Sequence, residues 1–280
     1  MRRIRIPAVL SATAASAAVL ASAAMAATII DNDRGHVIRG TSDNDTISAN
    51  GGRDVVRAFA GNDVVDAGSG SDRVQAGLGN DMVFGNSGWD LINGAGGNDL
   101  LNGDHGNDVV FGAAGDDTVN GGLHHDRLFG GHGNDTVNGD EGHDLVSGGT
   151  GDDVEHGGAL RDRMFANQGV DQLFGDDGND DLWALARADV NTSSGPDTTA
   201  DSVHGGDGND TIHTRDGEAD NIDCGPGDHD RALLDQQDVI VDATTDNPNG
   251  SCEVVVRADP KPQDNTTENQ QQSSSDGDQK

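Results

Sequence analysis

Aspartate recurs at every ninth position from Asp45 to Asp180, which gives sixteen copies in one register. A glycine stands two residues before the aspartate in most copies, as Gly106 stands before Asp108. An aliphatic residue stands two residues after it in every copy but one, where Glu155 occupies that place. Ionised carboxylates only accept hydrogen bonds, and they bind hard cations. This spacing therefore predicts a cation site that is repeated along the chain.

The residues between the aspartates indicate which elements hold them. Residues 103–111 read Gly-Asp-His-Gly-Asn-Asp-Val-Val-Phe, and the other copies follow the same pattern. Six positions rich in Gly, Asn and Asp favour turns with positive φ and disfavour helix. The last three positions suit a very short strand that points its aliphatic residue to one side. One such strand cannot bury its aliphatic residue alone, so successive copies must stack.

The unit G-x-x-G-x-D-x-U-x, in which U is aliphatic, resembles the calcium-binding nonapeptide of the RTX (repeats-in-toxin) family, also called hemolysin-type calcium-binding repeats. The resemblance implies an all-β fold, a right-handed parallel β-roll (β-solenoid) with two nonapeptides in each coil. It also implies that several Ca²⁺ ions lie between turns of adjacent coils, held by the aspartate and by main-chain carbonyls. The aspartates expected to bind calcium are Asp45, Asp54, Asp63, Asp72, Asp81, Asp90, Asp99, Asp108, Asp117, Asp126, Asp135, Asp144, Asp153, Asp171, Asp180 and Asp210.

Stacking brings like charges together, which a cation would relieve. Neighbouring carboxylates ~5 Å apart repel by roughly 1 kcal/mol even in bulk water. The formal net charge of −33 is then explained by bound metal, and it disfavours nucleic acid as a partner. The alternative is that the acidic turns are only solvated, but random acidity would not keep a nine-residue phase. We expect the weakest sites at His124 and Leu160, which replace the turn glycine, at Glu155, and at the break after Asp180.

Composition indicates that folding depends on the metal. Hydrophobic residues make up 32% of the chain and aromatic residues 3%, which is too little for a conventional core of this length. Low hydrophobicity with high charge is typical of disordered chains. We therefore expect the chain to be largely unfolded without calcium and to fold when it binds calcium.

The N-terminus indicates export. Arg2, Arg3 and Arg5 precede an apolar run that ends in Ala24-Met25-Ala26, which is the pattern of a secretory signal peptide over residues 1–26. A membrane anchor is the alternative, but the run is short and rich in alanine. The mature chain is then expected to be secreted and extracellular, without a membrane span.

The periodicity also predicts the domain organisation. We expect the main β-roll at residues 31–183, an inserted loop at 184–200, degenerate repeats forming a C-terminal cap at 201–257, and a disordered tail at 258–280. Cys224 and Cys252 are the two cysteines of the chain, and in an exported protein they favour one disulfide within the cap. Two free thiols are the alternative.

The sequence gives no sign of an enzyme. The zinc-protease pattern H-E-x-x-H and the serine elbow G-x-S-x-G are both absent. The predicted insertion is too short for a catalytic domain. Histidines in the turns would allow a zinc or copper site, although solvated turn positions are their more common role; they are His105, His124, His125 and His143.

Outward positions flanking the aliphatic residue suggest a second function. The third residue after the aspartate is aromatic in several even copies and asparagine in odd copies, which predicts an aromatic ladder on one sheet and an asparagine ladder on the other. These residues are Phe111, Phe129, Phe165 and Trp183, and Asn102, Asn120 and Asn138. Such ladders commonly just stabilise a sheet. The alternative is a calcium-dependent, adhesin-like module that binds a glycan, a surface or a protein.

Overall fold

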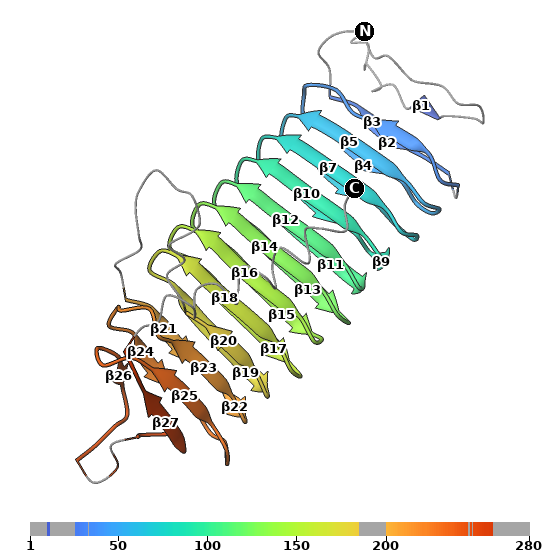
Figure 1. The fold of residues 1–280 in the computed structure, drawn as a ribbon. Helices are drawn as coiled ribbons and strands as arrows, with labels where there is room; N and C mark the ends of the chain where they lie inside the picture. The colour runs from blue at the N-terminus through green and yellow to red at the C-terminus, as the bar shows by residue number, and fades with distance from the viewer. Residues whose placement is uncertain are drawn as a thin grey trace, which may run out of the picture. The chain divides into compact units, whose positions relative to one another are not determined.

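The computed structural model describes residues 10–11, 26–32, 34–184, 200–245, 247 and 249–259. These residues form strands, turns and bends and contain no helix, which confirms the all-β prediction. Among them, no helix is available that could cross a membrane. Most of the predicted signal peptide, the predicted loop and the predicted tail lie outside the described residues. Figure 1 shows the strands in chain order, from β1 in blue to β27 in dark red. The chain divides into two compact units, residues 1–135 and 136–280, and each is described by itself.

In the first unit, strands alternate between two parallel sheets. The first sheet contains β1 (Leu10–Ser11), β2 (Thr28–Ile30), β4 (Thr46–Ser48), β6 (Val64–Asp66), β8 (Met82–Phe84), β9 (Ser87–Gly88), β11 (Leu100–Gly106) and β13 (Thr118–Leu123). The second sheet contains β3 (Val37–Arg39), β5 (Val55–Ala60), β7 (Arg73–Leu78), β10 (Leu91–Gly96), β12 (Val109–Ala114) and β14 (Arg127–His132).

The second unit repeats this alternation. Its first sheet contains β15 (Thr136–Glu141), β17 (Val154–Ala159), β19 (Gln172–Gly178), β21 (Ser202–His204), β22 (Asp207–Gly208), β24 (Asn221–Asp223) and β26 (Val239–Ile240). Its second sheet contains β16 (Leu145–Thr150), β18 (Arg163–Gln168), β20 (Asp181–Trp183), β23 (Thr211–Thr214), β25 (Arg231–Leu234) and β27 (Val254–Arg257).

Each coil holds two nonapeptides, as the repeat predicts. Val56 in β5 pairs with Val74 in β7, and Leu101 in β11 pairs with Val119 in β13, so partners in the first unit are eighteen residues apart. All pairings described within each unit are parallel. The chain is therefore a β-solenoid of the β-roll type.

The aliphatic residues of the repeat form the core between the two sheets. They are almost completely buried from Ile47 to Leu128 in the first unit and from Val137 to Ile240 in the second, where the buried Glu155 takes the place of one of them. Full burial of one Val, Leu or Ile side chain contributes roughly 1.5 to 3 kcal/mol. The core is one residue deep, so its stability comes from repetition, and each coil depends on its neighbours.

The second unit keeps the stacking where the sequence period is lost. Leu173 pairs with Val203 across thirty residues, Val203 pairs with Ile222 across nineteen, and Ile212 pairs with Ala232 across twenty. The strand register is thus kept although the number of residues between paired strands varies. In the same region, Cys224 and Cys252 form the disulfide that the sequence favoured.

Candidate metal centre

We call the aspartate of each repeat, which enters the turn before a strand, a rung aspartate. These aspartates form two continuous hydrogen-bonded columns within each unit. The main-chain N–H of each aspartate donates to Oδ1 of the aspartate in the next coil, as Asp63 does to Asp81 at 2.8 Å and Asp90 does to Asp108 at 2.7 Å. These side chains are at most a few per cent exposed. The amide fixes one carboxylate oxygen, so each aspartate has a defined orientation along the column.

The second carboxylate oxygen has no such partner. Oδ2 is buried and makes no hydrogen bond in Asp54, Asp63, Asp72, Asp81, Asp90, Asp99, Asp108 and Asp117 of the first unit, and in Asp162, Asp180, Asp210, Asp220 and Asp230 of the second. An unsatisfied buried acceptor is costly, and an anionic one is more so. A repeated deficit of donors at the same atom is the pattern expected where a cation completes the site.

Glycines keep the space around Oδ2 free of side chains. A Cβ placed on Gly94 would lie 2.2 Å from Oδ2 of Asp99 and 2.8 Å from the Gly112 carbonyl oxygen. At the other glycine of the motif, a Cβ on Gly88 would lie 1.2 Å from the Gly70 carbonyl oxygen. Carboxylate and carbonyl oxygens thus line the turns at close approach. This all-oxygen donor set suits calcium, which takes six to eight oxygen ligands.

Metal-free carboxyl groups in these columns resist ionisation. Burial raises the pKa of Asp108 to about 8; the Asp90 amide lowers it, and the charges of Asp90 and Asp126 raise it again. The same balance raises the pKa of Asp90 to about 7 and that of Asp63 to about 6. A bound divalent cation would reverse this by favouring the charged form.

An exposed ladder of asparagines runs beside the first-sheet aspartate column of the first unit. Asn80 N–H donates to Oδ1 of Asn62 at 2.9 Å, and Asn98 N–H donates to Oδ1 of Asn80 at 3.0 Å. In the first-sheet column of the first unit, the residues just before the aspartates, from Asn62 to Asn134, therefore also bind the adjacent coil. This explains why asparagine recurs beside the aspartate without being a candidate metal ligand.

The columns of the second unit continue through the irregular region. Asp171 N–H donates to Oδ1 of Asp201, and Asp180 N–H donates to Oδ1 of Asp210, both at 2.8 Å. Asp201 and Asp210 are in turn joined in the same way to the next rungs, at 2.8 Å. The sequence prediction named Asp210 but omitted four rungs with the same geometry: Asp162, Asp201, Asp220 and Asp230. The nine-residue step between Asp201 and Asp210 was the sequence signal that could have identified Asp201 as a rung.

Two of the expected weak points keep the rung geometry. His124 and Leu160, which replace the turn glycine, adopt φ of 86° and 80°. This is a left-handed conformation that costs a side chain more than glycine. Asp162, which follows Leu160, still accepts the Asp144 amide at 2.7 Å and donates to Asp180 at 2.8 Å.

Glu155 differs from the other departures because its side chain enters the core. It is completely buried in β17, at a place taken by aliphatic side chains in neighbouring coils. Its Oε1 accepts the Gly148 amide, whereas Oε2 has no hydrogen-bond partner. Burial, followed by the charges of Asp171 and Asp153, raises the pKa of Glu155 well above its usual range.

Three column ends are closed by chain-specific contacts. Asp45 receives the Thr41 amide at 2.5 Å and the Thr41 hydroxyl at 3.1 Å. Asp238 Oδ2 accepts the Thr214 hydroxyl at 2.7 Å. Glu253 replaces aspartate at the last rung of its column and accepts the Asp230 amide at 2.6 Å. Ordinary donors and acceptors therefore terminate these columns.

The outer faces carry aromatic ladders on both sheets, unlike the prediction of one aromatic and one asparagine face. Phe111 stacks on Phe129 in the second sheet of the first unit, with ring centroids 4.9 Å apart. In the second unit, Trp183 stacks on His213 at 3.6 Å in the second sheet. Phe174 lies between His156 and His204 in the first sheet, at 4.7 and 4.9 Å. The prediction missed Phe174 because it followed only the even copies.

The asparagine ladder was predicted correctly for the first unit, where Asn120 donates to Oδ1 of Asn102 at 2.8 Å. The four turn histidines do not form a group with metal-ligand spacing among the described residues. His143 instead accepts the Arg161 amide at 3.0 Å.

The sequence was also compared with known proteins. It matches the family of the RTX calcium-binding nonapeptide repeat (4 copies) at residues 39–74, 66–101, 94–123, 120–155, 156–190 and 197–218. No match was found among curated proteins. The matched segments span more than half of the chain and coincide with the aspartate columns. The chain therefore belongs to the RTX calcium-binding nonapeptide repeat family.

Proposed function

We propose that this is an exported, non-enzymatic calcium-binding repeat protein in which calcium drives the folding of the β-roll. The observation that carries the proposal is the buried Oδ2 atom without a hydrogen bond at successive rungs, for example in Asp81, Asp99 and Asp117. The proposed ligands are the sixteen aspartates named from the sequence together with Asp162, Asp201, Asp220 and Asp230, and the turn carbonyls beside them. Once bound, calcium supplies positive charge between coils whose carboxylates otherwise repel.

The chain's own groups prepare the sites. Main-chain amides orient Oδ1, glycines leave room beside Oδ2, and the aliphatic core sets the spacing between coils. Extracellular modules commonly bind calcium with Kd of roughly 10⁻⁴ to 10⁻³ M, which suits millimolar calcium outside the cell. The proposed export rests on the N-terminal pattern over residues 1–26, and the disulfide is compatible with it.

Far-UV circular dichroism of the mature chain tests calcium-driven folding. In chelator at neutral pH we expect a coil spectrum, and calcium titration should produce the β spectrum cooperatively. Magnesium at equal ionic strength is the control and should be much less effective, because it needs near-ideal octahedral geometry. An unchanged β spectrum in excess chelator would contradict the proposal. Mass spectrometry of exported protein tests cleavage after Ala26.

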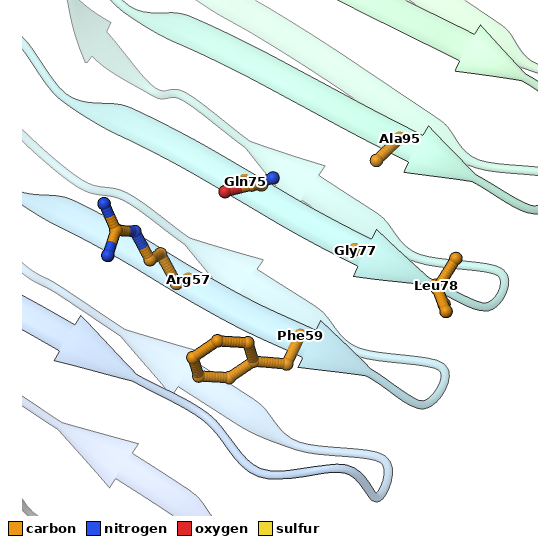
Figure 2. A pocket seen from close by; sticks show the side chains of 6 residues that line it. All are labelled: Arg57, Phe59, Gln75, Gly77, Leu78 and Ala95. Atoms are coloured by element: carbon orange, nitrogen blue, oxygen red, sulfur yellow. The ribbon is translucent and has the colours of Figure 1, made fainter.

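A second candidate function, glycan binding by the outer sheet face, is favoured by a hollow of about 410 Å³ in the first unit. Figure 2 shows Arg57, Phe59, Gln75 and Leu78 on the outer face of β5 and β7. Phe59 is 48% exposed and would offer a ring face to a sugar, whereas Phe165 is only 8% exposed.

A glycan array probed with and without calcium tests this second candidate. Phe59→Ser should abolish any binding while leaving calcium-induced folding intact. Binding that survives in Phe59→Ser, or no binding to any glycan, would remove the hollow as a ligand site.

A further inference from the structure

The N-terminal end of one aspartate column has a different chemistry from the rest. His36 occupies the rung that precedes Asp54 by eighteen residues, and its N–H donates to Oδ1 of Asp54 at 2.6 Å. Its imidazole therefore stands where the repeat would place a carboxylate. Asp31 lies beside it, with Oδ2 at 2.7 Å from Nδ1 of His36.

These three residues form a cluster with the spacing of a metal site. One ligand atom from each of Asp31, His36 and Asp54 lies within 4.8 Å of the other two, and this is the one such group of three found in the described parts of the chain. Four-coordinate zinc with ligands at ~2.0–2.1 Å holds them about 3.3 Å apart. The Asp31–His36 pair is slightly closer than that, and a small rotation of either side chain would open it.

The three ligand atoms are short of hydrogen-bond partners. Oδ2 of Asp54 is buried and has none, and Oδ2 of Asp31 and Nδ1 of His36 have only their 2.7 Å contact with each other. The Asp31 side chain is 7% exposed and Asp54 is fully buried, whereas the His36 side chain is 36% exposed, which gives an ion access from solvent. Two carboxylates that lie this close in a buried place repel each other, and a bound cation would stabilise both.

Hydrogen bonds to the next coil hold the backbone of Asp31 and His36 in place. The Asp31 amide donates to the Ser48 carbonyl at 2.8 Å, the Asn50 side chain donates to the Asp31 carbonyl at 2.5 Å, and the Val55 amide donates to the His36 carbonyl at 2.8 Å. The matching end of the other column contains no such group, because Thr41 supplies the donors to Asp45. The two N-terminal column ends therefore differ: hydrogen-bond donors close one, and a cluster of possible metal ligands lies at the other.

We propose that Asp31, His36 and Asp54 bind a first-row transition-metal ion, with Zn²⁺ as the probe, at the N-terminal end of the column. An imidazole nitrogen with two carboxylates suits zinc, whereas calcium takes oxygen ligands. This site is separate from the calcium sites between coils, although Asp54 borders both. The remaining zinc coordination is left to water.

The test is calorimetric titration of Zn²⁺ into the calcium-saturated mature protein. We expect one zinc per chain, weakened by His36→Asn and by Asp31→Asn at least as much as the ~10- to 100-fold that loss of an outer-shell partner costs. His105→Asn, which alters an exposed turn histidine, is the matched control and should bind zinc normally. Nitrogen-15 NMR of the histidine rings should show zinc at Nδ1 of His36.

His36→Asp is the conservative variant, because it restores the residue type of the repeat. It should lose zinc and gain about one calcium. No zinc binding to the calcium-loaded protein, or equal affinity in His36→Asn and Asp31→Asn, would overturn the site. Calcium-induced circular dichroism of each variant separates this result from a failure of the roll to fold.

Discussion

The two units reach the same aspartate geometry from different sequences. In the first unit, rungs are eighteen residues apart and amide-to-carboxylate distances are 2.6 to 2.8 Å. In the irregular part of the second unit, rungs are separated by thirty, nineteen and twenty residues, and the distance is still 2.8 Å; it lengthens to 3.4 Å from the Asp220 amide to Asp238. The sequence period is therefore one means of building the column. The parts common to both units are an aspartate, a buried core residue two positions after it, and space beside the aspartate.

The second unit also has reinforcements that the first lacks among the described residues. A disulfide joins Cys224 to Cys252, and rings stacked on histidine follow both sheets, whereas the stack described in the first unit is Phe111 on Phe129. Each unit has one tryptophan, Trp89 or Trp183. Single-tryptophan variants, made with Trp89→Phe or Trp183→Phe, would therefore report each unit separately.

The largest expected effect is acid-induced folding without metal. Folded-state pKa values of about 6 for Asp99, about 7 for Asp117 and about 8 for Asp162 lie above the ordinary value of 3.8. Groups with raised folded pKa contribute full stability below the unfolded value and lose it as pH rises through the folded value. In chelator, we expect a β spectrum near about pH 5 that disappears between about pH 6 and 8.

The same pH scan in saturating calcium should be flat between about pH 6 and 8, since calcium holds the carboxylates ionised. A coil spectrum in chelator at about pH 5 would contradict buried carboxyl repulsion as the reason that the metal-free chain unfolds. Separate scans on the two single-tryptophan variants would show whether the irregular unit folds at the same pH as the regular one.

Loss of the disulfide should have the next largest effect, and only in the second unit. Cys224→Ser with Cys252→Ser opens a loop with a sequence separation of 28, which should cost about 3 kcal/mol. Urea unfolding in calcium, followed by Trp183 fluorescence, should shift to lower urea. The Trp89 signal is the internal control, and an equal shift there would show that the bond does not act locally.

A methyl group beside one carboxylate should disrupt the regular unit. In Gly94→Ala, the new Cβ meets Oδ2 of Asp99, so we expect a loss of about 1 to 3 kcal/mol and of about one calcium. Gly96→Ala is the matched control, because its Cβ would meet nothing closer than 3.4 Å. Calorimetric stoichiometry and urea unfolding measured with Trp89 decide the result. Equal effects of both variants would remove the space beside Oδ2 as the cause.

Replacing the buried glutamate should have the smallest effect, and it should be favourable. Glu155→Leu restores an aliphatic core residue and removes Oε2, which has no hydrogen-bond partner, so we expect a gain of about 1 kcal/mol. The urea midpoint measured with Trp183 should rise. A fall in the midpoint together with the loss of one calcium would instead show that Glu155 is a metal ligand.

Much of this arrangement was predictable because each repeat places the same residue types at the same positions. The aspartate columns, the aliphatic core and the Cys224–Cys252 pair follow from residue type and spacing. The rungs at Asp201, Asp220 and Asp230 were harder to predict, because strand pairing tolerates a varying number of residues between paired strands. A nine-residue count cannot detect that tolerance.

Other features depend on local conformation and contacts that the repeat pattern does not specify. Asp162 was omitted because Leu160 was expected to disturb its turn, yet Leu160 adopts the left-handed conformation. The contact of Asp31 with His36 was not predicted, because the sequence showed only that His36 stood in the place of an aspartate.

The amide-to-carboxylate hydrogen bonds give the coils a direction. In both units the earlier coil donates and the later coil accepts, from the Ala27 amide at Asp45 to the Asp230 amide at Glu253. The outer asparagine ladder runs the other way, because there the later coil donates, as the Asn80 amide does to Asn62. At the aspartate columns, one end of a unit presents amides and the other presents carboxylates, so a second copy could extend a column only head-to-tail. A chain cut before Glu253 would leave the Asp230 amide without its carboxylate acceptor.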